Sequence, residues 1–505
     1  MFRKTKKNIL VISVLLLLSV NSFSQNTPKR EFRGVWMHVV GPYSYKNQHP
    51  EDIKQFLRNA LNNFQELGMN AVIFQVRPTA DALYSSEIEP WSKYLTGQQG
   101  KAPIGNFDLM EFMIRECHKR NIEFHAWINP YRVTLGEMTP LDKKHIYFRH
   151  PEWFVQYNSQ IYFDPGVPNC RKHICSVVQD IVKRYDVDAI HMDDYFYPYP
   201  IAGEVFPDDI SFSFFNKKFT DKGEWRRNNV NLLIQEIKQS IVKTKPWVRF
   251  GISPFGIYRN RKSTPDGSGS NTNGLQAYDD LYADVKLWVQ KGWIDYNIPQ
   301  LYWEIGHKDA DYETLIHWWN KNNYGAHLYI GQDVPRTMNA TDPIIMSKNQ
   351  LPRKLKLEQS LPAVYGRCFW SGYDVLNNTG EIADSLYRNY QRYPALIPAY
   401  LHMHNKSPNE VRALKAGSQN SSYKLYWKRN GDPKNPKNAQ YYVVYRSLGT
   451  RPPNLNDPSA IVAITRETEI RLPYQTGNDT YTYIVTSVDR YHNESQKGKS
   501  ITVRL

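Results

Sequence analysis

Between residue 32 and about residue 400, short runs of β-branched and aromatic residues alternate with segments of helical period. This alternation predicts parallel βα units. In segment 51–67, Ile53, Leu57 and Leu61 recur at helical spacing, and the segment stops at Gly68, where a C-cap glycine belongs. The segments 109–120 and 230–243 have the same pattern.

Eight candidate strands stand between these helices, at residues 32–39, 71–76, 122–127, 188–193, 248–253, 294–300, 326–331 and 366–371. Eight units favour an α/β fold of the (β/α)8 TIM-barrel class. A doubly wound open sheet fits the alternation less well, because no glycine-rich phosphate loop follows the first strand.

After about residue 404 the pattern changes to period-two alternation with turn residues between short runs. Seven candidate strands lie at residues 411–414, 423–427, 440–446, 461–464, 469–472, 480–488 and 500–503. This number in about 100 residues predicts an all-β, immunoglobulin-like sandwich. The segment resembles a fibronectin type III domain, with Trp427 in the place of that family's core tryptophan. We therefore expect a barrel over residues 25–404 and a fibronectin type III-like domain over residues 405–505.

Residues 1–24 have the pattern of a secretory signal peptide: a basic start, an apolar run over residues 8–20, and small residues at Ser22 and Ser24. The apolar run is shorter than the ~20 residues that span a bilayer. We expect a mature chain that begins near Gln25 and is secreted, periplasmic or associated with the cell surface, with no transmembrane segment after cleavage.

Charge and cysteine content narrow the possible binding partners and the possible fold classes further. The net charge is +15, and from Lys406 onward sixteen Lys and Arg face eight Asp and Glu. We expect this basic end to attract an anionic envelope polymer. No nucleic-acid-binding motif accompanies the charge, so we expect no nucleic-acid partner. Four cysteines in 505 residues make no disulfide scaffold, although a bridge between Cys170 and Cys175 is conceivable.

In a barrel, reacting groups stand at the carboxyl ends of strands. Here these ends carry Arg77 and Asp81 (second strand), Trp127, Asn129, Tyr131 and Arg132 (third), His191, Asp193, Asp194 and Tyr195 (fourth), and Gln300, Tyr302, Trp303, Glu304 and His307 (sixth).

The sharpest signal is the adjacent pair Asp193 and Asp194. Carboxylates at the end of an apolar strand are costly unless they are hydrogen-bonded or used in chemistry. Because side chains alternate along a strand, Asp193 shares a face with His191, toward the barrel mouth. We expect Asp193 to be the nucleophile or base and Asp194 to orient the substrate. The alternative is a structural cap.

Glu304 is the expected counterpart. Its aromatic surroundings would keep it from water in the protonated form that a general acid needs. One ionised and one protonated carboxyl are the minimum for cleaving a glycosidic bond. A surface ion pair is the alternative role for Glu304. Sugar-binding candidates are Arg77, Asp81, Trp127, Asn129, Tyr131, His191, Tyr195, Gln300, Tyr302, Trp303 and Trp370.

The runs "FRGVWM", "FHAWINPYR", "IHMDDYFYP", "FGISPFGIYRN" and "YNIPQLYWEIGH" resemble, in order, the motifs of the glycosyl hydrolase-like family 10. The resemblance implies a (β/α)8 barrel, export and glycoside hydrolysis, with members associated with peptidoglycan glycan strands. It places the family's acids at Asp193, Asp194 and Glu304. After the first strand, "HVVGPYSYKNQHP" departs from the family's "NIDWPS"-like run, so one wall of the cleft is expected to differ.

The sequence thus predicts a secreted glycoside hydrolase that acts on a polysaccharide or oligosaccharide, of peptidoglycan type, with no cofactor and no metal. Two other functions stay open. The first is a non-catalytic polysaccharide-binding protein. The second is a metal-dependent deacetylase or amidase, with His125, His191 and His307 beside Asp193 as candidate ligands.

Overall fold

The computed structural model describes residues 27–136, 140–419, 422–473, 479–496 and 498–505. The predicted signal peptide lies outside the described residues. Within them, no helix combines the length and apolar character that crossing a bilayer requires.

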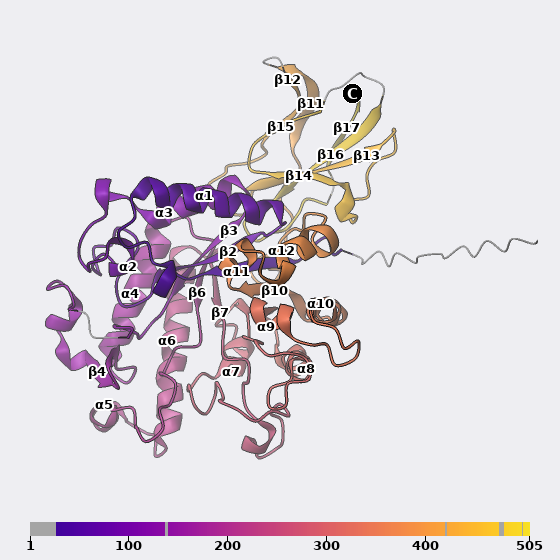
Figure 1. The fold of residues 1–505 in the computed structure, drawn as a ribbon. Helices are drawn as coiled ribbons and strands as arrows, with labels where there is room; N and C mark the ends of the chain where they lie inside the picture. Colours follow the sequence, from indigo (N-terminus) through magenta and orange to yellow (C-terminus); the bar gives the residue numbers. More distant parts are fainter. Residues whose placement is uncertain (1–26, 137–139, 420–421, 474–478, 497) are drawn as a thin grey trace, which may run out of the picture.

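Eight parallel strands form the barrel (Figure 1). They close in the order β1-β10-β9-β8-β7-β6-β3-β2. The predicted TIM barrel is confirmed. Its strands are β1 (Phe32–Met37), β2 (Ala71–Arg77), β3 (Glu123–Ile128), β6 (Ala189–Met192), β7 (Arg249–Ile252), β8 (Tyr296–Asn297), β9 (His327–Asp333) and β10 (Val364–Trp370).

Helices surround the barrel; most lie in the connections between successive strands, and the last two follow β10. They are α1 (Pro50–Glu66), α2 (Lys93–Thr96), α3 (Leu109–Lys119), α4 (Pro168–Arg184), α5 (Asp209–Phe215), α6 (Lys222–Thr244), α7 (Val285–Gln290), α8 (Tyr312–Asn322), α9 (Val334–Asn339), α10 (Leu351–Ser360), α11 (Gly372–Leu376) and α12 (Ile382–Ser385). Helix α6 begins earlier than its apolar pattern predicts, because the Asp221 side chain caps it by accepting from the amide of Glu224. Cys170 and Cys175 both lie in α4, and both are free thiols.

A small hairpin in the loop between β3 and α4 has no counterpart in the predicted elements. Its strands are β4 (Phe154–Tyr157) and β5 (Gln160–Phe163). The hairpin bonds back to the loop after β3, since the amide of Val133 donates to the carbonyl of Ile161. It therefore steadies the loop that carries Arg132.

The C-terminal region forms two antiparallel sheets, as the period-two pattern predicts. One has the order β11-β12-β15 and the other β14-β13-β16-β17. Leu425, Trp427, Tyr442 and Val485 fill the space between them. The strands are β11 (Arg412–Gln419), β12 (Ser422–Lys428), β13 (Tyr441–Leu448), β14 (Ile461–Thr465), β15 (Glu469–Arg471), β16 (Thr480–Val488) and β17 (Lys499–Arg504).

This sandwich sits at the end of the barrel where the strands begin, and its four-stranded sheet is the nearer one (Figure 1). Val443, Tyr445 and Ile484, on the outer side of that sheet, pack with Leu396 from the segment after the barrel. The Nζ of Lys29, just before β1, lies 2.6 Å from Oε2 of Glu494. The C-terminal domain is thus joined to the barrel by apolar and ionic contacts.

The seam between the first and last barrel strands is held by a buried ion network. Glu31 accepts from Arg33 on β1 at 2.7 Å and from Arg367 on β10 at 2.6 Å. Arg367 also pairs with Glu358 of α10 at 2.6 Å. Arg367 thus bridges two acidic residues, and these charge-assisted hydrogen bonds help to close the barrel between β1 and β10.

Candidate active site

A cavity of about 600 Å³ opens at the carboxyl end of the barrel strands. A volume of this order suits a small ligand or part of a polymer. It is lined by Trp36, His38, Val40, Gln75, Trp127, Arg132, Leu135, Asp193, Asp194, Tyr195, Tyr199, Ser253, Phe255, Gln300, Tyr302, Trp303, Arg336 and Trp370.

Two buried carboxylates lie together in this cavity because they directly follow β6. Asp193 accepts from Nδ2 of Asn129, at 2.8 Å and 2.6 Å to its two oxygens, and from the indole of Trp127 at 3.2 Å. Asp194 accepts from the hydroxyl of Tyr199 and from Nε2 of Gln300, the latter at 3.1 Å. Every one of these donors is uncharged, and the nearby charge is that of Arg132, which lines the same cavity and lowers the pKa of both carboxyls.

Burial, together with the neighbouring charge of Asp194, raises the pKa of Asp193 to about 7. Burial also raises the pKa of Asp194, while the hydrogen bonds from Tyr199 and Gln300 oppose the rise. Two carboxyls this close titrate as a coupled pair. Near neutral pH, the pair holds one proton and one negative charge, which is the combination that acid–base catalysis of glycoside cleavage needs.

Aromatic rings form much of the rest of the cavity wall. The rings of Trp36, Trp127 and Trp370 meet edge to face, with centroids 6.5 Å apart for Trp36–Trp370 and 6.1 Å for Trp127–Trp370. Tyr302 lies edge-on to Trp36, and Trp303 lies edge-on to Phe255. Rings that are apolar on their faces and polar at one edge suit sugar rings, so the predicted stacking residues Trp127, Trp303 and Trp370 all reach the cavity.

Several predicted sugar-binding residues do not line the cavity, because the protein's own groups occupy their polar atoms. Arg77 forms a buried bidentate pair with Glu89, at 2.6 Å and 2.7 Å. Asp81 accepts from Thr79 and Gln99, and burial raises its pKa to about 6. These two residues shape the loop after β2 and do not face a ligand.

The remaining predicted residues act behind the cavity wall. Asn129 is fully buried and contacts the site through two residues of the cavity wall, because it donates to Asp193 and accepts from Gln75 at 2.7 Å. Tyr131 is 1% exposed and belongs to the core. His191 does not point to the mouth; its ring lies inside the barrel, bonded to Tyr296 at 3.2 Å and Ser253 at 3.0 Å.

Glu304 does not line the cavity either. It lies in the turn between β8 and α8, where its carbonyl accepts from the amide of Tyr312. Its charge acts on buried Lys354, whose Nζ donates to the carbonyl of neighbouring Trp303 at 2.9 Å. The structure thus brings Asp193 together with Asp194, Tyr195, Gln300, Tyr302 and the tryptophans, and leaves Glu304 outside.

Sequence comparison agrees with this geometry. A model of the family described as "Glycosyl hydrolase-like 10" matches residues 31–346, more than half of the chain. The chain belongs to this family.

Relatives of this glycosyl hydrolase-like 10 protein carry matching names. "Glycosyl hydrolase YngK" of Bacillus subtilis (strain 168) is 40% identical over 97% of this chain and 98% of its own. "Glycosyl hydrolase DigH" of Escherichia coli (strain K12) is 36% identical over 66% of this chain and 81% of its own. Among solved structures, the PgaB (BpsB) glycoside hydrolase domain from Bordetella bronchiseptica matches 72% of this chain and 99% of its own, with 11% identity and a TM-score of 0.46. The protein is a glycoside hydrolase, and its substrate is a carbohydrate.

Three lining residues of this glycosyl hydrolase-like 10 site are absent from the sequence-based candidates although patterns mark them. Trp36 and His38 are two residues apart on and after β1, so they share the inward face. Tyr199 ends the aromatic run that follows the acidic pair. His38 and Val40 belong to the segment that departs from the family motif, and they do form part of the cavity wall.

The candidate metal ligands have separate partners. His125 bonds to Glu123 at 3.1 Å and to the hydroxyl of Tyr296 at 2.9 Å, deep in the barrel. His307 accepts from the amides of Asp309 and Ala310 in a surface turn. In the part of the chain that the structure describes, no three His, Cys, Asp or Glu side chains are placed to hold a metal ion.

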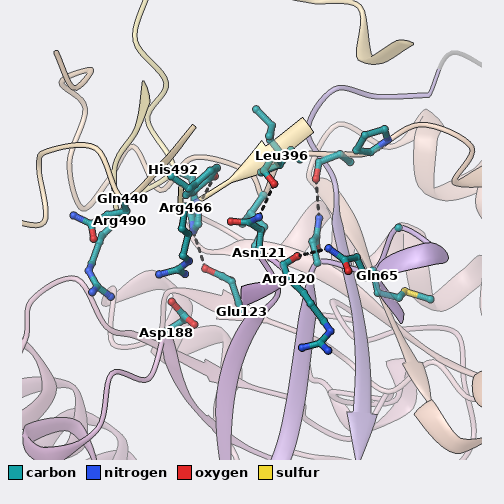
Figure 2. Close-up of a pocket in the computed structure, with 18 of the residues that line it drawn as sticks. Gln65, Arg120, Asn121, Glu123, Asp188, Leu396, Gln440, Arg466, Arg490 and His492 are labelled. Carbon is teal, nitrogen blue, oxygen red and sulfur yellow. Dashed lines mark hydrogen bonds and ion pairs between the residues drawn. The ribbon is translucent and has the colours of Figure 1, made fainter. Parts of the chain in front are cut away.

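A second cavity, of about 180 Å³, lies between the amino ends of the barrel strands and the C-terminal domain (Figure 2). There Nε2 of His492 lies 2.8 Å from Oε1 of Glu123, which also pairs with Arg249. Burial opposes ionisation of Glu123, but Arg249 and His492 lower its pKa well below the ordinary value. The buried acid at this end is thus neutralised by cations, which is typical of a structural junction.

Proposed function

We propose that this glycoside hydrolase is exported and cleaves glycan strands of the bacterial envelope, of peptidoglycan type, with Asp193 and Asp194 as its catalytic pair. The observation that carries the proposal is the coupled pair itself. It stands in an aromatic-lined cavity, and Asp193 has a pKa raised to about 7. A signal-like N-terminus and the basic C-terminal region support an envelope location and an anionic envelope polymer as partner.

In this mechanism Asp193 donates its proton to the glycosidic oxygen as the bond to the anomeric carbon breaks. Asp194 remains ionised, held by Tyr199 and Gln300, and takes the proton of the attacking water. The pair then carries one proton again, on the other carboxyl, and transfer between neighbours restores the starting state. This assignment gives Asp193 the acid role that the sequence assigned to Glu304.

The two carboxyls follow the same strand, whereas a conventional pair flanks the scissile bond from two sides. Adjacent placement favours a reaction in which Asp194 orients the attacking group instead of attacking. That group is water or the 2-acetamido oxygen of the substrate itself, as in substrate-assisted glycosidases. Peptidoglycan strands consist of 2-acetamido sugars, so the second route is open to this substrate.

The decisive experiment measures new reducing ends released from purified glycan strands by Asp193→Asn, Asp194→Asn and Glu304→Gln. Loss of a general acid or of its partner lowers turnover by about 10²–10⁴-fold. We expect that loss in both aspartate variants and turnover within about twofold of wild type in Glu304→Gln, the matched carboxyl-to-amide control. Wild-type turnover in Asp193→Asn would reject the mechanism.

The same assay separates the other functions. A polysaccharide-binding protein releases no reducing ends and retains glycan binding in all three variants. A deacetylase or amidase releases acetate or peptide instead of sugar. Comparison of intact strands with chemically N-deacetylated strands tests the acetamido route, because only the intact strands would be cleaved at full rate.

Export is tested by expressing the full chain in a bacterium and determining the N-terminus of the protein outside the cytoplasm. We expect it near Gln25. Uncleaved protein confined to the cytoplasm would overturn the proposed location.

A further inference from the structure

The outer side of the sheet β11-β12-β15 is crowded with positive charge. We call this side the cationic face. It consists of Arg412, Lys415, Lys424, Lys428 and Arg471, around Tyr426 and Gly417.

Strand alternation explains why the cations share one side. In β12, Leu425 and Trp427 are buried in the sandwich core, so Lys424, Tyr426 and Lys428 point outward. The register continues this arrangement across the sheet, since Tyr426 lies opposite Lys415 and Lys424 lies opposite Arg471.

A shift in register in β11, between residues 412 and 415, sets the last position of the face. Arg412 lies opposite Lys428, and both side chains are exposed. Such a bulge re-aims side chains at the edge of a sheet. Here it adds a second pair of like charges, which repel each other unless an anion lies between them.

The barrel does not cover this side. The other sheet of the sandwich is the one that packs toward the barrel, through Val443 and Tyr445. In Figure 1, β11, β12 and β15 lie at the far end of the molecule. The cationic face is therefore open to solvent and to a large partner.

Internal pairing neutralises little of the charge. Glu469 is the one acidic side chain on the face, and it lies 2.5 Å from Nζ of Lys424. Arg412, Lys415, Lys428 and Arg471 form no salt bridge with any acidic side chain of the described residues. At Gly417 an added Cβ would meet nothing within 4 Å, so the centre of the face is open beside the Tyr426 ring.

We propose that the cationic face binds a carboxylate-bearing polysaccharide and holds the catalytic barrel on the polymer that it cleaves. Repeated positive charges on a flat surface match a linear polyanion, and Tyr426 offers a ring for a sugar among them. The identification of this polymer with the peptidoglycan-type substrate rests on the proposed function. The assignment of the binding surface is independent of it.

The test uses the full chain with Lys415→Gln, Lys428→Gln and Arg471→Gln combined. Lys424 is left in place because it pairs with Glu469. The matched control combines Lys434→Gln, Lys437→Gln and Arg451→Gln, which removes the same charge from exposed loop positions of the same domain. Binding is measured by affinity electrophoresis through polygalacturonate and by co-sedimentation with peptidoglycan sacculi, before and after amidation of their carboxylates.

We expect the face variant to bind both polymers about tenfold more weakly, because three exposed charge contacts each contribute a small factor. The control should bind within about twofold of wild type, amidated sacculi should lose binding, and added salt should weaken it. Turnover of soluble oligosaccharides should be unchanged in both combined variants.

Equal weakening by both variants would overturn the proposal, because net charge alone would then explain binding. Equal or tighter binding of double-stranded DNA through the same residues would overturn the assignment to polysaccharide. Retained binding in a protein that releases no reducing ends would reject the proposed function and leave the cationic face standing.

Discussion

Buried carboxylates occur at both ends of the barrel, and their surroundings differ. At the amino end, Glu123 contacts Arg249 and His492, and Asp295 pairs with Lys238 at 2.6 Å. At the carboxyl end, Asp193 and Asp194 accept hydrogen bonds only from amide, indole, phenol and backbone groups.

The pKa values differ in the same way. Burial opposes ionisation at both ends, but Lys238 lowers the pKa of Asp295, as Arg249 does for Glu123. The pKa of Asp193 is raised by burial and by Asp194. A buried carboxylate that pairs with a cation contributes to stability. A buried carboxyl beside a second carboxyl lowers stability but carries a proton that catalysis can use.

The largest effect on stability is expected from Glu123→Gln. It leaves Arg249 buried without its carboxylate, which costs about 3–5 kcal/mol of unfolding free energy. Urea denaturation measures this loss. The control is Glu152→Gln, whose exposed carboxylate pairs only with exposed His150 and should change stability by less than about 0.5 kcal/mol. An equal loss of unfolding free energy in both variants would show that the buried pair contributes no more to stability than the exposed one.

His492→Ala should have the next largest effect. It removes the contribution of the C-terminal domain to the Glu123 cluster and a contact with the Tyr441 hydroxyl at 3.0 Å. A buried polar group left unsatisfied costs about 1–3 kcal/mol. Thermal unfolding of the full chain measures the loss, with His317→Ala, at an exposed position of α8, as the control. No destabilisation would show that the domain rests on the barrel without supporting it.

Asp193→Asn is expected to stabilise the folded protein, whereas the two substitutions above destabilise it. A carboxyl whose folded pKa is raised favours the fold below its unfolded pKa, near 4, and loses that contribution as pH rises through about 7. The variant should therefore be more stable than wild type by about 1–2 kcal/mol at pH 8 and show no gain at pH 4. A gain of the same size at both pH values would point to a cause other than titration.

A smaller effect is expected in the pH dependence of turnover. Activity should fall as pH rises through about 7, where Asp193 loses its proton. Tyr199→Phe removes a hydrogen bond that lowers the pKa of Asp194, so the acidic limb should move to higher pH while the alkaline limb changes less. The kcat/KM profile of the free enzyme measures both limbs. If neither limb of the profile moved in Tyr199→Phe, Asp194 would have no role in the mechanism.

Local pattern was enough to predict the barrel strands, since each is a short apolar run between polar turns. The apolar pattern does not predict where α6 begins. The first residues of this helix are polar, and the Asp221 cap sets its start. The pattern also does not predict the β4–β5 hairpin, because the pairing of these strands depends on contacts with the loop after β3.

The site was predictable where a side chain directly follows a strand, as Asp193 and Asp194 follow β6, or lies within three residues of its end, as Gln300 does after β8. Glu304 is four residues further along, and the turn that carries it runs back to Tyr312. Arg77 is on a strand, but Glu89, twelve residues away, occupies its guanidinium. Neither the course of a turn nor the choice of an ion-pair partner is visible in the spacing of residue types.

The Glu31–Arg367 ion pair spans almost the whole length of the barrel sequence, from just before β1 to β10. During synthesis, the first strand must therefore wait for a partner that leaves the ribosome more than three hundred residues later. A nascent chain that ends before β10 has an open seam, in which Glu31 keeps Arg33 as a partner but lacks the link through Arg367 to Glu358. The barrel can therefore close only after the final strand has been made.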